Sequence, residues 1–364
     1  MIFYTHERNF GCRVTEYVYR GLRTVTLENE LLRVTTLADK GSDIFEFLYK
    51  PLDVDFMWRS PWGVRNPSNF VPTSHTSASS FLDFYEGGWQ DCMPTGGKPC
   101  EYQGLPFGAH GETPTMPWEY RIVQDTPERI AVKFWVRTYR TPFYIEKELA
   151  LESGKPTLAI EEQITNEGRA PMQLMWGQHP ALGAPFLDGD CVIDLPGAQV
   201  HCRNLSTNTR FSEGVYTWPH VPGKDGTPID LRQVATIEAN TFDTIRLDSL
   251  RAGWYAVTNS RRKVGFGMAW PLDVFPALWF WQVYGGAYGP PWYGRTYNIA
   301  LEPFSTVQPS IVEAIADGSA HVLEPGQSIQ AQFVAVAFAG IERVSQITPN
   351  GQVVAVPDTF APQR

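Results

Sequence analysis

Alternating apolar and less apolar positions recur along most of the chain. In the clearest segment, Ile130, Val132, Phe134 and Val136 occupy every second position. The same period of two is found in residues 158–164, 264–270 and 329–337. Alternation over four to eight residues predicts strands with one buried face. Turn-forming pairs such as Pro325-Gly326 separate these segments and favour hairpin connections.

Helical patterns are scarce. Only residues 308–316 are consistent with a short helix, and no amphipathic pattern extends over about twelve residues. Many short strands with regular turns predict an all-β sandwich or barrel rather than βαβ units. We expect a single β-sandwich domain over residues 1–345. The prolines and the weak pattern of residues 346–364 predict a C-terminal tail.

Composition narrows the class of protein. Hydrophobic residues make up 43% of the 364 residues and charged residues 19%, so the chain can bury a substantial core. The net charge of −9 argues against nucleic-acid partners. No apolar run approaches the length of a membrane span. The chain starts without the pattern of a secretion signal, so we expect a cytoplasmic location. Five scattered cysteines without a CxxC pair indicate neither a disulfide framework nor a zinc knuckle.

Two titratable side chains stand out near predicted strand ends. In residues 172–180, Met172, Leu174 and Trp176 form an apolar face, so parity places His179 on the opposite face. In residues 296–303, the same reasoning places Glu302 opposite an apolar face. A histidine and a carboxyl group on one open face can serve as the general acid and the general base that proton transfer requires. The alternative is a structural histidine and a solvated glutamate.

A glycine-flanked loop offers a second kind of chemistry. His110 and Glu112 lie in Gly108-Ala-His-Gly-Glu112. Their spacing resembles that of metal ligands on a β-scaffold, as in a metal-dependent sugar isomerase or oxygenase of the jelly-roll type. No second histidine follows at the short distance that such sites need. An ordinary turn is the simpler alternative.

The ordered set of motifs resembles the aldose 1-epimerase (galactose mutarotase-like) family. The matching pieces are Ala109-His-Gly-Glu112, Gly177-Gln-His-Pro180, Ala300-Leu-Glu-Pro303 and Leu323-Glu-Pro-Gly-Gln-Ser328. The resemblance covers roughly residues 25–340 and keeps the order of the motifs. It implies a β-supersandwich of antiparallel sheets. It also implies an isomerase of carbohydrate metabolism that interconverts the α and β anomers of a free aldose.

The resemblance also implies roles for individual residues. Glu302 would be the base that takes the proton of the C1 hydroxyl, and His179 the acid that protonates the ring oxygen. His110 would hydrogen-bond the ring oxygen or a nearby hydroxyl. Such a reaction needs no metal or organic cofactor, and its partner is a small-molecule sugar. A homodimer is a further expectation, which no residue pattern tests.

The sequence departs from the family pattern in two places. The Asn-Arg pair expected before the His-Gly segment is absent, and residues 84–97 are glycine-rich instead. Trp89 and Gln90 in this stretch are candidates for sugar contacts, since an indole can pack on a pyranose and an amide can bridge hydroxyls. A glycine turn with a buried tryptophan is the alternative. The loop also carries Glu112 where the family has a second glycine, so we predict that Glu112 binds substrate beside His110.

Further candidates concern specificity. Asp243 lies where the family places a sugar-binding aspartate, although a turn aspartate would look the same. Arg13, Lys40 and Arg295 could bind an anionic sugar substituent, or could simply be solvated. The tryptophan-rich residues 279–293 are expected to be core, with a Gly- and Pro-containing loop that could wall a pocket. A non-catalytic carbohydrate-binding or lyase-like protein on the same scaffold stays open as an alternative.

Overall fold

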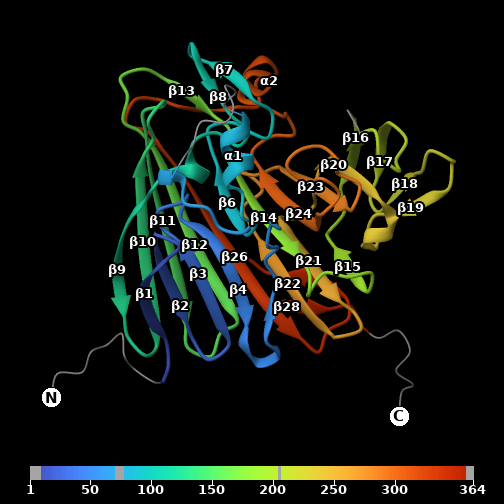
Figure 1. The fold of residues 1–364 in the computed structure, drawn as a ribbon, viewed down its shortest axis with the longest axis horizontal. Coiled ribbons are helices and arrows are strands. Elements are labelled where there is room, and N and C mark those ends of the chain that lie inside the picture. The colour runs from blue at the N-terminus through green and yellow to red at the C-terminus, as the bar shows by residue number, and fades with distance from the viewer. Residues whose placement is uncertain (1–9, 70–77, 204–205, 358–364) are drawn as a thin grey trace.

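Two large antiparallel sheets pack face to face and form a sandwich (Figure 1). The computed structural model describes residues 10–69, 78–203 and 206–357. Within these residues the larger sheet has 12 strands and the smaller sheet has eight. The predicted all-β class with antiparallel sheets is therefore confirmed.

The larger sheet brings together strands that are far apart in the sequence. Its strands lie in the order β1 (Arg13–Tyr19), β2 (Leu22–Glu28), β3 (Leu32–Leu37), β4 (Asp43–Tyr49), β6 (Trp89–Cys92), β14 (Gly177–Gly183), β24 (Tyr297–Phe304), β23 (Ala277–Tyr284), β20 (Thr241–Asp248), β16 (Gln199–Cys202) and β17 (Gly214–Thr217). A short strand, β5 (Val54–Asp55), pairs with β4. The sheet centre is thus built from the two predicted segments with His179 and Glu302, which are adjacent strands β14 and β24.

The smaller sheet contains the strands with the clearest alternation. Its order is β15 (Cys191–Asp194), β21 (Trp254–Asn259), β22 (Val264–Ala269), β26 (Ser328–Ala339), β12 (Thr157–Asn166), β11 (Phe143–Glu152), β10 (Arg129–Arg137) and β9 (Glu119–Asp125). The predicted strands at 130–136, 158–164 and 329–337 lie within β10, β12 and β26. Their apolar positions face the other sheet.

Small elements surround the sandwich. Four two-stranded pairs are β7 (Cys100–Tyr102) with β8 (Leu105–Phe107), β13 (Met172–Leu174) with β25 (His321–Leu323), β18 (His220–Pro222) with β19 (Pro228–Asp230), and β27 (Val344–Ile347) with β28 (Val353–Ala355). The helices are α1 (Ala78–Phe84) and α2 (Ile311–Ala316), with 3-10 turns at Lys50–Leu52, Pro67–Asn69, Thr113–Thr115 and Ile237–Ala239. Helix α2 lies inside the predicted helix at 308–316, whereas α1 was not expected. None of the helices in the described ranges has the length and apolar character needed to cross a membrane.

The β27–β28 hairpin lies at the start of the predicted C-terminal tail. Val344 and Ile347 are buried against Trp254 and Val336 of the smaller sheet. This part of the segment is therefore packed on the sandwich. The division of the chain into a domain over 1–345 and a tail stays a prediction.

The main core fills the space between the two sheets, as the alternation predicts. Phe47 of the larger sheet meets Phe266 of the smaller sheet edge to face, with ring centroids 5.3 Å apart, a favourable geometry for aromatic pairs. The central strands β14, β23 and β24 are buried on their outer faces as well. A second apolar cluster, which includes Phe81, Tyr85 and Trp281, covers that outer face.

Candidate active site

A cavity of about 550 Å³ lies on the outer face of the larger sheet, beneath α1. This volume suits a small-molecule ligand. Aromatic and titratable side chains line it together, among them His110, His179, Arg246, Trp279, Trp281 and Glu302.

Strand register aligns the cavity residues in one row across the sheet. Because Gly177 pairs with Phe304 and Ala181 with Ala300, His179 lies directly opposite Glu302. Residues that face each other in an antiparallel pair project on the same side of the sheet. The two segments identified in the sequence therefore meet through backbone pairing.

The row continues on both sides of this pair. Glu302 pairs with Trp279 of β23, and Trp279 pairs with Arg246 of β20. On β16, His201 pairs with Arg246. Four neighbouring strands thus contribute His179, Glu302, Trp279 and Arg246 to one floor.

The His179–Glu302 pair is close and almost fully buried. His179 Nε2 lies 3.6 Å from Glu302 Oε1, and the residues are 4% and 2% exposed. Burial lowers the pKa of His179 to about 4. Burial raises the pKa of Glu302 to about 8, with a smaller opposing effect from Arg246. At neutral pH the pair therefore holds one proton, which resides on Glu302.

Two further side chains fix the His179 ring. The Tyr85 hydroxyl lies 3.3 Å from His179 Nδ1. The His110 ring lies nearly perpendicular to the His179 ring, with centroids 4.9 Å apart. Burial lowers the pKa of His110, so His110 is neutral at pH 7 and has one donor and one acceptor nitrogen.

The His-Gly sequence of the loop has a steric reason. His110 has φ of 63° and Gly111 has φ of 79°, a conformation that favours glycine. A Cβ on Gly111 would overlap the Met93 carbonyl. The His110 N–H donates to the Gly96 carbonyl at 2.7 Å. The loop therefore turns tightly against residues 93–96 and places the imidazole over the cavity.

Arg246 faces the cavity from β20 and rests on an aromatic ring. Its guanidinium carbon lies 3.6 Å from the Trp279 ring centroid, a cation–π contact. Burial lowers its pKa to about 10, so it remains charged at neutral pH. Sequence reasoning missed Arg246. The available signal was an arginine at an alternating position of a strand next to a tryptophan-rich segment.

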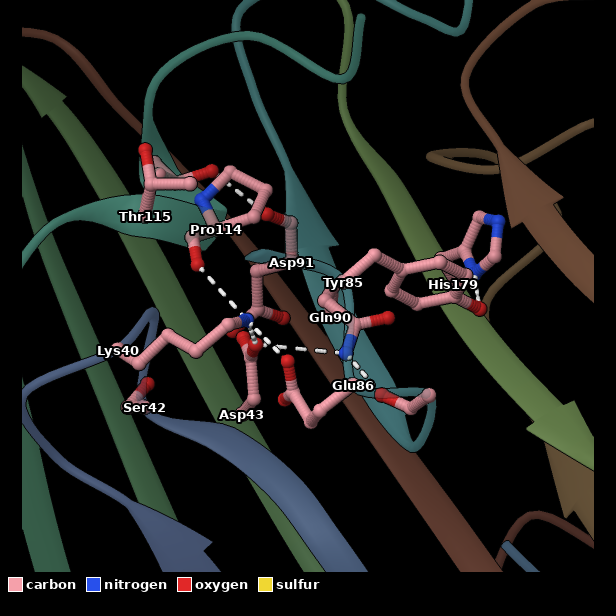
Figure 2. Close-up of polar contacts among 12 residues, drawn as sticks. Lys40, Ser42, Asp43, Tyr85, Glu86, Gln90, Asp91, Pro114, Thr115 and His179 are labelled. Carbon is pink, nitrogen blue, oxygen red and sulfur yellow. Dashed lines mark hydrogen bonds and ion pairs between the residues drawn. The ribbon is translucent and has the colours of Figure 1, made fainter. Parts of the chain in front are cut away.

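A buried ionic cluster supports the cavity from the side of Tyr85 (Figure 2). Lys40 Nζ lies 2.5 Å from Asp43 Oδ2 and 2.6 Å from Glu86 Oε2, and all three side chains are at most 1% exposed. Gln90 Nε2 donates to the Gly87 carbonyl at 2.6 Å and to Asp43 Oδ2 at 3.3 Å. Burial raises the pKa of Asp43. The cluster fixes the segment that follows Tyr85.

Of the seven predicted site residues, His110, His179 and Glu302 meet in the cavity. The other four do not line it. Trp89 Nε1 donates to Gln178 Oε1 at 2.6 Å within the core. Gln90 bonds within the cluster of Figure 2.

Glu112 and Asp243 point elsewhere. Glu112 accepts hydrogen bonds from the backbone N–H groups of Tyr139 and Arg140 and from the Thr141 hydroxyl, at 2.9–3.0 Å. By strand parity Asp243 lies on the opposite face of β20 from Arg246, where burial raises its pKa.

The three cations proposed to bind an anionic substituent also lie outside the cavity. Arg13 pairs with Glu28 on β2, Lys40 is held in the buried cluster, and Arg295 is exposed.

The geometry does not favour the metal-site hypothesis for His110 and Glu112. The Glu112 carboxylate is satisfied by the 139–141 turn, whereas His110 faces the cavity. Over the described residues, no group of three or more His, Cys, Asp or Glu side chains is arranged to hold a metal ion.

Comparison with known families finds one family model. The model described as "Domain of unknown function (DUF4432)" matches residues 19–335, which is most of the chain. No curated protein matches the sequence.

Solved structures match over nearly the whole chain. A candidate aldose 1-epimerase from Klebsiella pneumoniae has a TM-score of 0.71 at 15% identity, covering 90% of this chain and 88% of its own. A galactose mutarotase-like protein from Clostridium acetobutylicum has a TM-score of 0.56 at 12% identity, covering 90% and 99%. A galactose mutarotase-like protein from Lactobacillus casei has a TM-score of 0.54 at 14% identity, covering 86% and 100%. The predicted mutarotase-like fold is therefore confirmed.

Proposed function

We propose that this chain, which belongs to the family described as a domain of unknown function, DUF4432, is an aldose 1-epimerase. The reaction is the interconversion of α and β anomers of a free aldose by acid–base ring opening. The observation that carries this proposal is the buried His179–Glu302 pair, 3.6 Å apart on the floor of a sugar-sized cavity.

The proposed reaction requires two proton movements. One group of the pair takes the proton from the C1 hydroxyl while the other protonates the ring oxygen, and the C1–O5 bond breaks. Rotation about C1–C2 then presents the other face of the aldehyde. Ring closure returns both protons, so each group acts once as acid and once as base. The pair ends as it began.

Because His179 and Glu302 share one proton, either residue can serve as the acid while the other serves as the base. One proton on two groups leaves one acid and one base, whether the state is neutral His179 with protonated Glu302 or imidazolium with carboxylate. In the resting site, burial favours the first state. The assignment of Glu302 as base requires transfer of that proton to His179 after the sugar binds. Arg246 favours this transfer, because it lowers the pKa of Glu302.

The remaining cavity residues supply binding. Trp281 presents an aromatic surface to the cavity on which the C–H face of a pyranose can pack. His110 lies against His179, in a position to hydrogen-bond the ring oxygen or the adjacent hydroxyl. Holding the sugar between the two groups adds an orientation contribution to the rate.

The test is saturation-transfer NMR of anomeric exchange on a panel of free aldoses. The parent protein is compared with Glu302→Gln and His179→Asn, each checked for folding by circular dichroism. His220→Asn is the matched control, because His220 is exposed and does not line the cavity. We expect enhanced exchange on at least one sugar, lost in both cavity variants and retained in the control.

Absence of enhancement on every sugar, with folded protein, would refute the proposal. Sugar binding without exchange would instead support the carbohydrate-binding alternative.

A further inference from the structure

Arg246 is a charged side chain in the cavity, and no carboxylate of the described residues forms an ion pair with its guanidinium. Glu302 is near enough to interact with Arg246 electrostatically, but burial keeps Glu302 protonated at neutral pH, so its carboxyl group does not neutralise the arginine. Within the described part of the chain, Arg246 donates one hydrogen bond to protein, from Nη1 to the Ile245 carbonyl at 3.3 Å. The nearest carboxylate along its own face of β20 is Asp248, which binds His201 Nε2 at 2.9 Å. Most of the five guanidinium N–H donors of Arg246 are therefore left for a ligand.

Two other arginines of the sandwich have carboxylate partners. Arg33 Nη2 binds Glu46 at 2.7 Å and Arg343 Nη2 binds Asp194 at 2.5 Å. Arg246 is half-buried, and removing an arginine from water is costly unless a carboxylate or another anion compensates for it. The retention of an unpaired arginine against Trp279 therefore indicates that the compensating group belongs to the ligand.

The charges around Arg246 reinforce this conclusion. Arg203 follows β16 on the same face as His201 and also lines the cavity, without a carboxylate partner in the part of the chain that the structure describes. Lys98 lies at the margin and pairs with Glu313. Glu302 is the acidic residue of the lining. The cavity thus carries positive charge in a chain whose net charge is −9, and such a cavity concentrates anions.

We propose that the substrate is an aldose with an anionic substituent, a carboxylate or a phosphate, and that Arg246, assisted by Arg203, binds that substituent. This inference rests on the proposed function and names its substrate class. Arg246 is separated from Glu302 by strand β23, which corresponds to two strand spacings, about 10 Å of sheet. The anionic group is therefore bound on the β20 side of the cavity, where Arg246 rests on Trp279.

The experiment measures anomeric exchange by saturation-transfer NMR on D-glucuronic acid, D-glucose 6-phosphate and D-glucose. The first two sugars distinguish a carboxylate from a phosphate. The variants are Arg246→Met, which keeps an aliphatic side chain over Trp279, and Arg246→Lys, which keeps the positive charge but lacks the planar guanidinium group. Arg295→Met is the matched control, since Arg295 is exposed and outside the cavity.

We expect one anionic sugar to be exchanged with a kcat/KM about 10- to 100-fold above that of D-glucose, the usual value of a charged hydrogen bond. Arg246→Met should remove this advantage, mainly by raising KM, and Arg246→Lys should restore part of it. Exchange of D-glucose should fall less than exchange of the anionic sugar in Arg246→Met, because D-glucose loses only the effect of Arg246 on the pKa of Glu302. Arg295→Met should behave as the parent protein. The melting temperature of Arg246→Met should be equal to or above that of the parent, whereas a structural arginine would lower it.

The results separate this inference from the proposed function. Exchange of D-glucose at least as fast as that of both anionic sugars, or an equal loss on all sugars in Arg246→Met, would overturn the anionic substrate and leave the epimerase in place. Binding of an anionic sugar that Arg246→Met abolishes, without exchange of any sugar, would support the anion site and refute the epimerase. Calorimetric titration with the same three sugars supplies the binding measurement.

Discussion

His179 Nε2 lies 3.6 Å from Glu302 Oε1 across the boundary between β14 and β24. Burial shifts the two pKa values apart, to about 4 for His179 and about 8 for Glu302. Pairs whose environments separate their pKa values in this way are typical of acid–base sites. The singly protonated pair therefore persists over a wide pH range around neutrality.

The first prediction concerns the pH dependence of kcat/KM. Below about pH 4 the pair gains a second proton and lacks a base, and above about pH 8 it lacks an acid. We expect a bell-shaped profile with a plateau between these values. Measurement with the best sugar of the NMR panel tests this expectation. A plateau confined between the ordinary values of 4.5 and 6.5 would show that burial does not shift the pair.

The second prediction concerns stability. Glu302 keeps its proton in the folded state up to about pH 8, whereas an unfolded glutamate loses it near its ordinary value. Between the ordinary value of 4.5 and about pH 8, the folded state thus binds more protons than the unfolded state. The contribution of Glu302 to the free energy of unfolding is therefore lost as the pH rises through this range. The Glu302→Gln variant has no such proton to lose. Its stability relative to the parent should rise by several kcal/mol between about pH 5 and pH 8. Urea unfolding at both pH values measures the difference, and a constant difference would contradict the raised pKa.

Sequence reasoning predicted the fold more completely than the site. Alternation fixes which side chains face the core, so β10, β12 and β26 were predicted correctly from residues such as Phe134 and Phe333. The same parity placed His179 and Glu302 on an outer face. It could not show which strands are neighbours, because β14, β24, β23 and β20 are paired through long-range contacts. Arg246 therefore went unnoticed.

The predicted site residues that lie outside the cavity share a physical feature. Glu112 lies two residues from His110, and Gln90 lies next to Trp89, in motifs that look functional. Each nevertheless forms hydrogen bonds with nearby backbone. Whether a polar side chain is occupied by the protein depends on three-dimensional contacts that a short motif does not contain. Helix α1, which covers the cavity, is too short to give a helical period.

The third prediction separates a structural role of Glu112 from a substrate-binding one. Its carboxylate accepts three hydrogen bonds from residues 139–141. Glu112→Ala should lower stability by about 1–3 kcal/mol, because these donors lose their partner. Glu112→Gln keeps one acceptor oxygen and should cost less. Thermal unfolding and KM are measured on both variants, and a raised KM with unchanged stability would indicate contact with substrate.

The fourth prediction concerns the buried cluster of Figure 2. Lys40→Met leaves the Asp43 and Glu86 carboxyl groups buried without their cation. We expect a loss of about 3–5 kcal/mol in the free energy of unfolding, since breaking a buried ion pair exposes the full desolvation cost. Adding Asp43→Asn and Glu86→Gln to Lys40→Met should recover much of this loss. The exposed pair of Lys155 with Glu152 is the control, and Lys155→Met should cost below about 1 kcal/mol.

The fifth prediction uses two adjacent glycines to test the shape of the cavity. A Cβ on Gly97 would lie 3.6 Å from His110 Cε1 and 3.7 Å from Trp279 Cζ3, which are ordinary contacts. Gly97→Ala should fold normally and raise KM, because the methyl group takes up space that the sugar needs. A Cβ on Gly96 would overlap the Trp279 ring and lie 2.8 Å from the Pro309 carbonyl oxygen. Gly96→Ala should therefore lower stability by about 1–3 kcal/mol through overpacking. The free energy of unfolding and the KM for anomeric exchange are measured on both variants. If Gly97→Ala leaves KM unchanged, the sugar does not occupy the space between His110 and Trp279.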